Sequence, residues 1–356
     1  MKAMTFNAND EKYMRRALFL AKKGSGFVAP NPLVGAVIVN DDKIIGEGYH
    51  ERYGEAHAEV NAVNAVENKE QLKTATLYVT LEPCAHFGKT PPCSDLIIRH
   101  QFKRVVVACI DPFAAVAGKG IQKMIAAGIQ VEAGLLEKEA KFLNKRFFTF
   151  HVKKRPYITL KWAQSKDGFL DKKRKVGEVG VNWITQPETK LIVHALRAEN
   201  AGIMVGVNTI LADNPSLNVR HHFGPHPHRF ILDPENEIQD NAAVLDCSKQ
   251  PTTIFHRKDD GLKYTEINKV KLSNYSLSEI LSEIYRHNIH SLLIEGGAHT
   301  LNTFIEEDLW DEAHIFTGNC FFKDGLSAPK VPNGKKSSKQ IGNDTYEIVY
   351  HPNFEL

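Results

Sequence analysis

Three residues with soft metal-binding side chains stand at spacings that suit a single metal ion. His57 precedes Glu59 by two residues, and Cys84 and Cys93 each directly follow a proline. One imidazole and two thiolates supply three zinc ligands and leave a fourth tetrahedral position for water, which is the layout of a catalytic zinc site. Glu59 is available to move protons for that water. The pattern predicts metal-assisted hydrolysis.

The order His-x-Glu, then Pro-Cys, then a second Cys is typical of zinc deaminases that act on nucleobase-like rings. Two unrelated cysteines near a histidine would be the plain alternative, but the two prolines and the carboxylate favour the zinc site. We therefore expect one Zn²⁺ ion on His57, Cys84 and Cys93, with Glu59 as the catalytic proton carrier.

Alternating strands and helices are expected to position these residues. A helix over residues 13–23 ends at a glycine, and apolar strands then alternate with helices. The expected strands cover residues 33–39, 43–48, 75–81, 104–110 and 129–133, and the expected helices cover residues 56–66, 94–100 and 120–127. This alternation predicts an α/β layered domain with a buried sheet. Ligands at helix N-termini would favour thiolate over thiol.

Composition narrows the class of protein. The 356 residues suffice for two domains, and 42% hydrophobic with 24% charged residues is typical of a soluble globular chain. A net charge of +3 is too small to indicate nucleic acid or a membrane surface as a partner. The N-terminus lacks a signal-peptide pattern, no apolar run approaches about 20 residues, and five cysteines suggest no disulfide framework. We expect a cytoplasmic protein with a small-molecule substrate.

A domain boundary is expected near residue 150. An aromatic-rich helix is predicted over residues 137–150 and a basic connector over residues 151–156, which gives domains 1–150 and 151–356. The second half has no Gly-x-Gly-x-x-Gly after a strand. An apolar strand ends instead at Glu295-Gly296-Gly297, with a helix expected from Ala298. Such a turn can bind phosphate, although a plain tight turn is an equal interpretation.

Segments in both halves closely resemble the RibD-type bifunctional riboflavin biosynthesis proteins. They are residues 30–36, 57–60 and 80–93 in the first half, and residues 160–168, 182–185, 194–198, 209–215 and 291–301 in the second. The eight residues between the cysteines differ from the short Pro-Cys-x-x-Cys of nucleobase and tRNA deaminases. The resemblance covers nearly the whole chain, except the first ten residues and the tail after about residue 325.

The resemblance implies a cytidine-deaminase-like three-layer αβα domain followed by a dihydrofolate-reductase-like α/β domain. It implies zinc-dependent deamination of diaminohydroxyphosphoribosylaminopyrimidine with release of ammonia. The product's ribose would then be reduced to a ribityl chain with NADPH as hydride donor. A homo-oligomer, specifically a dimer through the reductase half, is also implied.

The resemblance assigns further site residues. Asn31 would contact the pyrimidine. NADPH contacts would be Ala163, Trp183, Thr209, Asp213, Gly297, Ala298, His299, Thr300, Leu301, Asn302 and Thr303, and substrate contacts would be Arg197, Leu217, Arg220 and Glu295.

Two features of the residues support part of this assignment. The guanidinium groups of Arg197 and Arg220 suit a ribose phosphate, with surface ion pairs as the alternative. Lys161 and Glu295 are expected as catalytic groups near the reacting ribose carbon. Lys161 would polarise or protonate the sugar oxygen, or else only pair with a carboxylate.

One residue and three segments depart from the family or attract another interpretation. Val181 stands where the family commonly has a substrate-binding serine, which would weaken binding by about 0.5–1.5 kcal/mol. The basic loop 171–175 before it is interpreted as solvated rather than phosphate-binding. Residues 111–114 replace the family's Asp-Pro-Asn-Pro. The histidine-rich run 220–228 is interpreted as a polar surface loop rather than a second metal site.

Two other functions stay open on the sequence. A monofunctional deaminase with a non-catalytic, ligand-binding second domain would release ammonia without consuming NADPH. A nucleic-acid base editor would need a strongly basic surface around the zinc pocket, which the near balance of charge does not favour. The sequence does not decide between NADPH and NADH, the oligomeric state, or channelling between the two sites.

Overall fold

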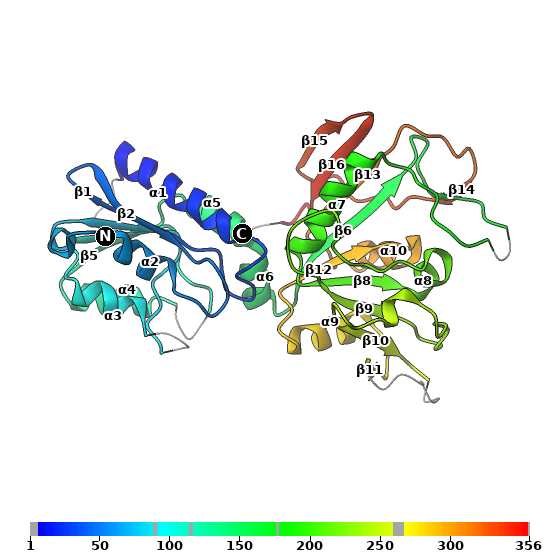
Figure 1. Cartoon of the computed structure of the whole chain (residues 1–356), viewed down its shortest axis with the longest axis horizontal. Helices are drawn as coiled ribbons and strands as arrows, with labels where there is room; N and C mark the ends of the chain where they lie inside the picture. The colour runs from blue at the N-terminus through cyan, green and yellow to red at the C-terminus, as the bar shows by residue number, and fades with distance from the viewer. Residues whose placement is uncertain (1–5, 88–90, 114–116, 176–177, 259–266, 355–356) are drawn as a thin grey trace. The chain divides into compact units, whose positions relative to one another are not determined.

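The computed structural model describes residues 6–87, 91–113, 117–175, 178–258 and 267–354. The chain divides into two compact units, Met1–Lys153 and Lys154–Glu355, drawn in blue to teal and in green to red in Figure 1. In the described part of the chain, every helix is too short or too polar to cross a membrane.

The first unit is built on a five-stranded sheet in the order β2-β1-β3-β4-β5. Strand β1 runs antiparallel to both of its neighbours, and β3, β4 and β5 are parallel. The strands are β1 (Gly35–Asn40), β2 (Lys43–Tyr49), β3 (Thr76–Val79), β4 (Arg104–Val107) and β5 (Gln130–Ala133).

Helices cover both faces of this sheet. Successive strand residues point to opposite faces, so Ile38 packs into one core and Val37 into the other. The first core contains α2 (Ala58–Ala65), α3 (Cys93–Arg99) and α4 (Lys119–Ala126), and the second contains α1 (Ala8–Ala21), α5 (Glu137–Leu143) and α6 (Lys145–Lys153). The predicted three-layer αβα arrangement is confirmed.

The single helix expected over residues 137–150 is wrong, because the chain breaks at Asn144 into α5 and α6. The buried Asn144 side chain accepts a hydrogen bond from Leu33 N at 2.8 Å and donates to Leu33 O at 2.9 Å. Asparagine competes well for backbone groups and is a weak helix former, so it ends α5 and ties the break to the loop before β1. The connector expected over residues 151–156 is wrong for residues 151–153, since α6 continues to Lys153.

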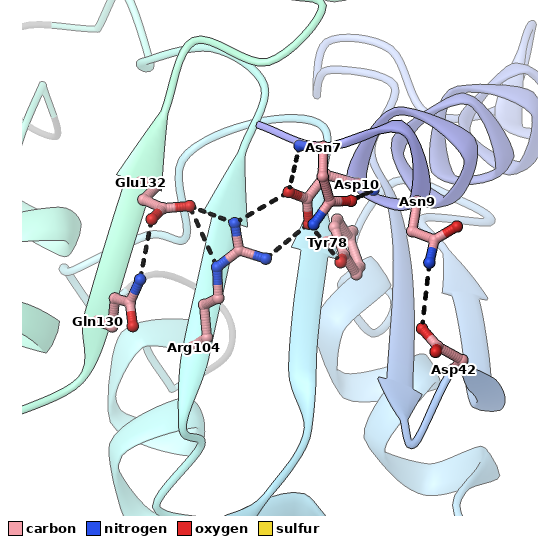
Figure 2. A network of polar contacts seen from close by, with 8 residues as sticks. All are labelled: Asn7, Asn9, Asp10, Asp42, Tyr78, Arg104, Gln130 and Glu132. Atoms are coloured by element: carbon pink, nitrogen blue, oxygen red, sulfur yellow. Dashed lines mark hydrogen bonds and ion pairs between the residues drawn. The ribbon is translucent and has the colours of Figure 1, made fainter. Parts of the chain in front are cut away.

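A buried ion pair fixes α1 against the sheet (Figure 2). Arg104 on β4 donates to Asp10 Oδ1 at 2.6 Å and also to Glu132, while the Tyr78 hydroxyl donates to Asp10 Oδ1 at 2.7 Å. Burial favours the neutral acid, but the hydrogen bonds from Arg104, Asn7 N and Tyr78 outweigh it and lower the pKa of the Asp10 carboxyl. Asp10 is therefore ionised, and its carboxylate binds the first turn of α1 to the sheet.

The second unit contains a nine-stranded sheet in the order β11-β10-β9-β8-β12-β6-β13-β16-β15. The strands from β11 to β13 are parallel, and the last two run antiparallel to their neighbours. In chain order they are β6 (Tyr157–Gln164), β8 (Gly202–Gly206), β9 (His228–Leu232), β10 (Thr252–His256), β11 (Asn268–Lys271), β12 (Ser291–Glu295), β13 (Glu312–Thr317), β15 (Lys336–Ile341) and β16 (Asp344–Tyr350).

Two apolar cores pack on opposite faces of this sheet. One core contains α7 (Pro187–Glu199) and α8 (Val207–Asp213), and the other contains α9 (Leu277–Arg286) and α10 (Ala298–Glu306). A separate two-stranded ribbon pairs β7 (Phe169–Lys172) with β14 (Gly325–Ser327). This mainly parallel sheet with helices on both faces agrees with the predicted α/β class.

Candidate active sites

The three predicted zinc ligands meet at one end of the first sheet. His57 caps α2, Cys93 is the first residue of α3, and Cys84 lies in the segment after β3. Their ligand atoms all lie within 4.8 Å of one another, with His57 Nδ1 at 3.7 Å from Cys84 Sγ and 3.3 Å from Cys93 Sγ. These distances suit three donors to one ion.

Cys84 does not stand at a helix N-terminus, contrary to one expectation. Its sulfur instead accepts a hydrogen bond from the backbone N–H of Cys93, at the start of α3, at 3.3 Å. One helix N-terminus therefore serves both sulfurs. Contacts with the Cys93 side chain and with His57 lower the pKa of the Cys84 thiol to about 4, while the same Cys84 contact and burial raise the pKa of Cys93. A divalent cation would replace the protons that these groups share.

Glu59 lies in the first turn of α2, beside the ligands and buried. Burial raises the pKa of its carboxyl to about 7, and the charge of His57 offsets this only in part. Glu59, His57 and Cys84 line a cavity of about 300 Å³. A carboxyl with a pKa near neutrality can both accept and donate a proton during one turnover.

A second, larger cavity of about 970 Å³ lies in the other unit and is lined by most of the remaining predicted residues. Those in the lining are Lys161, Ala163, Trp183, Arg197, Thr209, Asp213, Leu217, Arg220, Glu295, Gly297 and Leu301. The other predicted residues on α10 do not line it, namely Ala298, His299, Thr300, Asn302 and Thr303.

A buried charge cluster stands in this second cavity. Arg197 Nε and Nη2 donate to the two oxygens of Glu295 at 2.9 and 2.7 Å, and Lys161 Nζ lies 3.9 Å from Glu295 Oε2. Burial would raise the pKa of Glu295, but the charges of Arg197 and Lys161 outweigh it and lower the pKa to about 2. Burial lowers the pKa of Lys161, with Glu295 opposing that shift. Glu295 is thus a permanent anion between two cations.

Comparisons with known proteins agree with both halves of this geometry. A family model described as the cytidine and deoxycytidylate deaminase zinc-binding region matches residues 7–109, and one described as the RibD C-terminal domain matches residues 156–337. The riboflavin biosynthesis protein RibD of Aquifex aeolicus is 45% identical over 89% of this chain and 89% of its own length. The RibD of Escherichia coli K12 is 36% identical over 86% of this chain and 87% of its own.

The chain belongs to the RibD family. A diaminohydroxyphosphoribosylaminopyrimidine deaminase/5-amino-6-(5-phosphoribosylamino)uracil reductase from Thermotoga maritima, 36% identical, superposes with a TM-score of 0.86 over 96% of this chain and 99% of its own. Acinetobacter baumannii RibD, 33% identical, gives 0.86 over 96% and 98%. The protein is therefore a bifunctional deaminase and reductase of riboflavin biosynthesis, and a second domain that only binds a ligand is not favoured.

In this member of the RibD family, Asn31 meets a histidine that the sequence patterns did not single out. His50 Nδ1 lies 3.0 Å from the carbonyl oxygen of Ala56, which can only accept, so Nδ1 carries the ring proton. His50 Nε2 then accepts from Asn31 Nδ2 at 3.1 Å. Both side chains line the smaller cavity. A lone histidine after a strand gave no motif by which to find it.

Glu82 is a second residue that the sequence motifs did not single out. Its buried carboxylate accepts backbone hydrogen bonds from Gly118 at 2.8 Å and Gly120 at 2.9 Å, at the start of α4. A Cβ on Gly120 would lie 2.0 Å from the oxygen of Pro83, so only glycine permits this approach. Glu82 thereby anchors the segment that carries Cys84. A carboxylate directly before Pro-Cys was the available signal.

The remaining wall of the smaller cavity includes Phe147 and His151 from α6, together with Asp111 and Phe113. His151 lies beyond the expected end of the helix at residue 150, and Phe147 belongs to no motif that points to a site. Burial raises the pKa of the Asp111 carboxyl to about 6. Ala114, part of the unusual 111–114 segment, and residues 88–90 of the intercysteine loop lie outside the described residues.

The loop 171–175 is tied to the wall of the larger cavity. Arg174 donates to Asp171, to Asp213 Oδ1 at 2.7 Å and to the oxygen of Ala212 at 3.0 Å. Asn182, next to Val181, donates to Asp171 Oδ1 at 2.7 Å. The interpretation of a wholly solvated loop is therefore wrong for Arg174, whose charge is matched by two carboxylates. Val181 also lies in the lining.

The Gly-Gly turn after β12 packs directly on α8. Gly296 has φ 102°, and a Cβ there would lie 2.7 Å from Thr209 Oγ1. The N–H of Gly297 donates to the same oxygen at 3.0 Å, and α10 begins at Ala298 as expected. Trp183, 65% exposed, lies beneath Lys190 Nζ at 3.6 Å from its ring centroid. The Gly-Gly turn and the Trp183 indole both line the larger cavity.

Proposed function

We propose that the first unit, predicted as residues 1–150, deaminates diaminohydroxyphosphoribosylaminopyrimidine, and that the second, predicted as residues 151–356, reduces the ribose of 5-amino-6-(5-phosphoribosylamino)uracil. The observation that carries the proposal is the convergence of His57, Cys84 and Cys93 beside the buried carboxyl of Glu59. The names of the family members support the choice of substrates.

The donors of the first unit fit zinc, because one imidazole and two thiols within 4.8 Å are soft ligands of suitable number. A bound zinc ion supplies a Lewis acid that makes water nucleophilic near neutral pH. Glu59 removes a proton from the attacking water and delivers it to a ring nitrogen of the pyrimidine. Asn31, oriented by His50, holds the pyrimidine in place.

The proton carried by Glu59 balances the deamination. Water oxygen bonds to the carbon that bears the exocyclic 2-amino group, and the C–N bond then breaks. Glu59 passes the second water proton to the departing nitrogen, so ammonia leaves and a carbonyl remains. A carboxyl whose pKa is raised to about 7 suits both transfers at neutral pH.

The larger cavity fits NADPH, because its volume of about 970 Å³ and its exposed indole suit a dinucleotide. NADPH supplies the hydride that the ribose carbon accepts. In our proposal the dinucleotide contacts the cavity-lining residues Ala163, Trp183, Thr209, Asp213, Gly297 and Leu301.

Lys161 and Glu295 are proposed to act at the ribose. Lys161 donates the proton that the sugar oxygen needs as the ring opens, and Glu295 holds the ammonium group in place. Arg220 and Leu217 contact the ribose phosphate and its chain, and Arg197 acts mainly by orienting Glu295. One hydride and one proton together complete the reduction to a ribityl chain.

NADPH oxidation by the purified protein, supplied with the deaminase substrate, tests both activities together. We expect ammonia release followed by NADPH oxidation. A Glu59→Ala variant should do neither with that substrate, yet oxidise NADPH when given the deaminated product. Ammonia release with NADPH untouched would overturn the reductase assignment.

Assembly and location are proposed from the family resemblance and the composition. We infer a homodimer formed through the second unit, acting in the cytoplasm on a small molecule rather than on nucleic acid or membrane. Light scattering coupled to size-exclusion chromatography measures the mass, and a mass of one chain would contradict the dimer.

A further inference from the structure

A short segment of the larger cavity, residues 217–220, begins with a residue in a strained backbone conformation. Leu217 has φ 54°, in the left-handed region, and its side chain is 2% exposed. A bulky side chain such as leucine is sterically unfavourable there, and persists where surrounding contacts fix the backbone. Arg220, the proposed phosphate contact, lies three residues later in the same segment.

Two histidines fix this segment by accepting hydrogen bonds from its backbone N–H groups. The N–H of Val219 donates to His226 Nδ1, and the N–H of Arg220 donates to His194 Nδ1, each at 3.0 Å. An imidazole nitrogen accepts a hydrogen bond only when it carries no proton. Both rings therefore present Nδ1 as an acceptor, and two consecutive peptide groups are fixed.

The segment also connects Arg220 to the buried charge cluster. Asn218 O accepts from Arg197 Nη1 at 3.0 Å, and Asn218 Oδ1 accepts from Arg220 Nη1 at 2.6 Å. Arg197 in turn grips both oxygens of Glu295. A shift of this backbone would thus move Arg220 and remove a partner of Arg197 together.

The histidines come from two segments that pack tightly. His194, 4% exposed, lies one turn before Ala198 on α7. Gly224, with φ 146°, lies so close that a Cβ there would stand 2.7 Å from Ala198 Cβ. The ring of His221 meets that of His194 edge-on at 4.8 Å. The histidine-rich run therefore folds back on α7.

We propose that His194 and His226 are positioning residues of the reductase, which fix the backbone of residues 219–220 so that Arg220 faces the phosphate of the substrate. The inference rests on the proposed phosphate contact of Arg220. It gives the histidine-rich run, otherwise a surface loop, a role in substrate selection.

A matched pair of variants at each histidine tests the inference. In His194→Asn the side-chain oxygen takes the place of Nδ1 and can still accept from the Arg220 N–H, whereas His194→Leu cannot accept. We expect His194→Leu to raise KM for the phosphorylated substrate about 10-fold with kcat changed less than about twofold, because the Arg220 N–H loses its acceptor and the backbone beside it is no longer fixed. His194→Asn should restore KM to near the parent value. His226→Leu should likewise raise KM, and His226→Asn should restore it to near the parent value.

The dephosphorylated substrate separates positioning from general damage. His194→Leu should lower kcat/KM for the phosphorylated substrate several-fold more than for the dephosphorylated one, and combining His194→Leu with Arg220→Ala should cost less than the sum of the two single losses. Ammonia release by the same preparations confirms that the chain is folded. Equal losses on both substrates, or no rescue by asparagine, would overturn the inference alone. If Arg220→Ala does not distinguish the two substrates, the proposed phosphate contact fails, and the inference fails with it.

Discussion

The two active sites compensate their buried charges in different ways. In the deaminase unit, burial raises the pKa of Glu59 to about 7, while contacts with Cys93 and His57 lower the pKa of the Cys84 thiol to about 4. In the reductase unit, Arg197 and Lys161 lower the pKa of the equally buried Glu295 to about 2. The Glu59 carboxyl can therefore exchange protons near neutral pH, whereas the Glu295 carboxyl stays ionised and orients two cations.

This difference agrees with the ligands that we propose for each site. A zinc site must present anionic sulfurs whose compensating charge arrives with the ion, so its own side chains contribute little positive charge. A site for a phosphorylated sugar and a dinucleotide must hold its cations in place before the ligand binds. The protein therefore balances those cations internally, with Glu295 between Arg197 and Lys161.

Removal of a zinc ligand should separate the two sites most sharply. We expect Cys93→Ala to lose its zinc and to slow deamination by more than about 10⁴-fold. General acid–base catalysis alone contributes about 10²–10⁴-fold, and the activated water is lost as well. Metal content and ammonia release measure this. Cys247→Ala, in the other unit, serves as control and should keep both the zinc and the rate. Reduction of the deaminated substrate should persist in both variants.

Removal of the anion in the reductase site should act on stability as well as on activity. Glu295→Leu leaves Arg197 and Lys161 buried without their partner, so we expect a loss of about 3–5 kcal/mol in the free energy of unfolding of that unit. All three tryptophans of the chain, Trp162, Trp183 and Trp310, lie in this unit, so their fluorescence during denaturant unfolding reports on it alone.

The double variant Glu295→Leu/Arg197→Met is the matched control for that loss. It removes the main partner of Arg197 together with Arg197 itself, so much of the lost stability should return while NADPH oxidation stays abolished. A Glu295→Leu protein that unfolds with the parent free energy would contradict the account of Glu295 as the centre of the cluster.

The stability of the reductase unit should depend on pH through His194. Burial, with the charges of Arg197 and Arg220, lowers the pKa of His194 from 6.5 to about 4. Folding thus favours the neutral ring. The contribution of neutral His194 to the free energy of unfolding is therefore complete above pH 6.5 and is lost as the pH falls towards 4. We expect the tryptophan-detected unfolding free energy to fall by about 1–2 kcal/mol across that range. His194→Asn, which cannot titrate, should show a shallower slope; an unchanged slope would contradict this.

Restoring the family's serine should have the smallest effect. Val181 lines the reductase cavity next to Asn182, whose amide is bound to Asp171. Val181→Ser supplies a hydroxyl that can bond to the substrate, which is worth about 0.5–1.5 kcal/mol, so KM for the reductase substrate should fall by roughly 2- to 10-fold. Steady-state kinetics of NADPH oxidation measure it, and the rate of ammonia release should not change.

The elements of the first unit were predictable largely because each follows a local pattern. Apolar runs located β1 and β3, and the helices expected over residues 56–66 and 94–100 match α2 and α3, within a few residues of their ends. The break at Asn144 was not predictable, because its cause is a pair of hydrogen bonds to Leu33, 111 positions away in the chain. The anchoring roles of Glu82 and His50 depend on similar distant contacts.

The sequence alone determined the family and the residues that we propose as zinc donors and as the proton-carrying carboxyl, because these depend on residue types at short, fixed spacings. The tertiary structure decided which charges meet. It paired Arg197 with Glu295, bound Arg174 to Asp213 and folded the histidine-rich run onto α7. Such pairings depend on how strands and helices pack across long separations in the chain, and no local spacing encodes that packing.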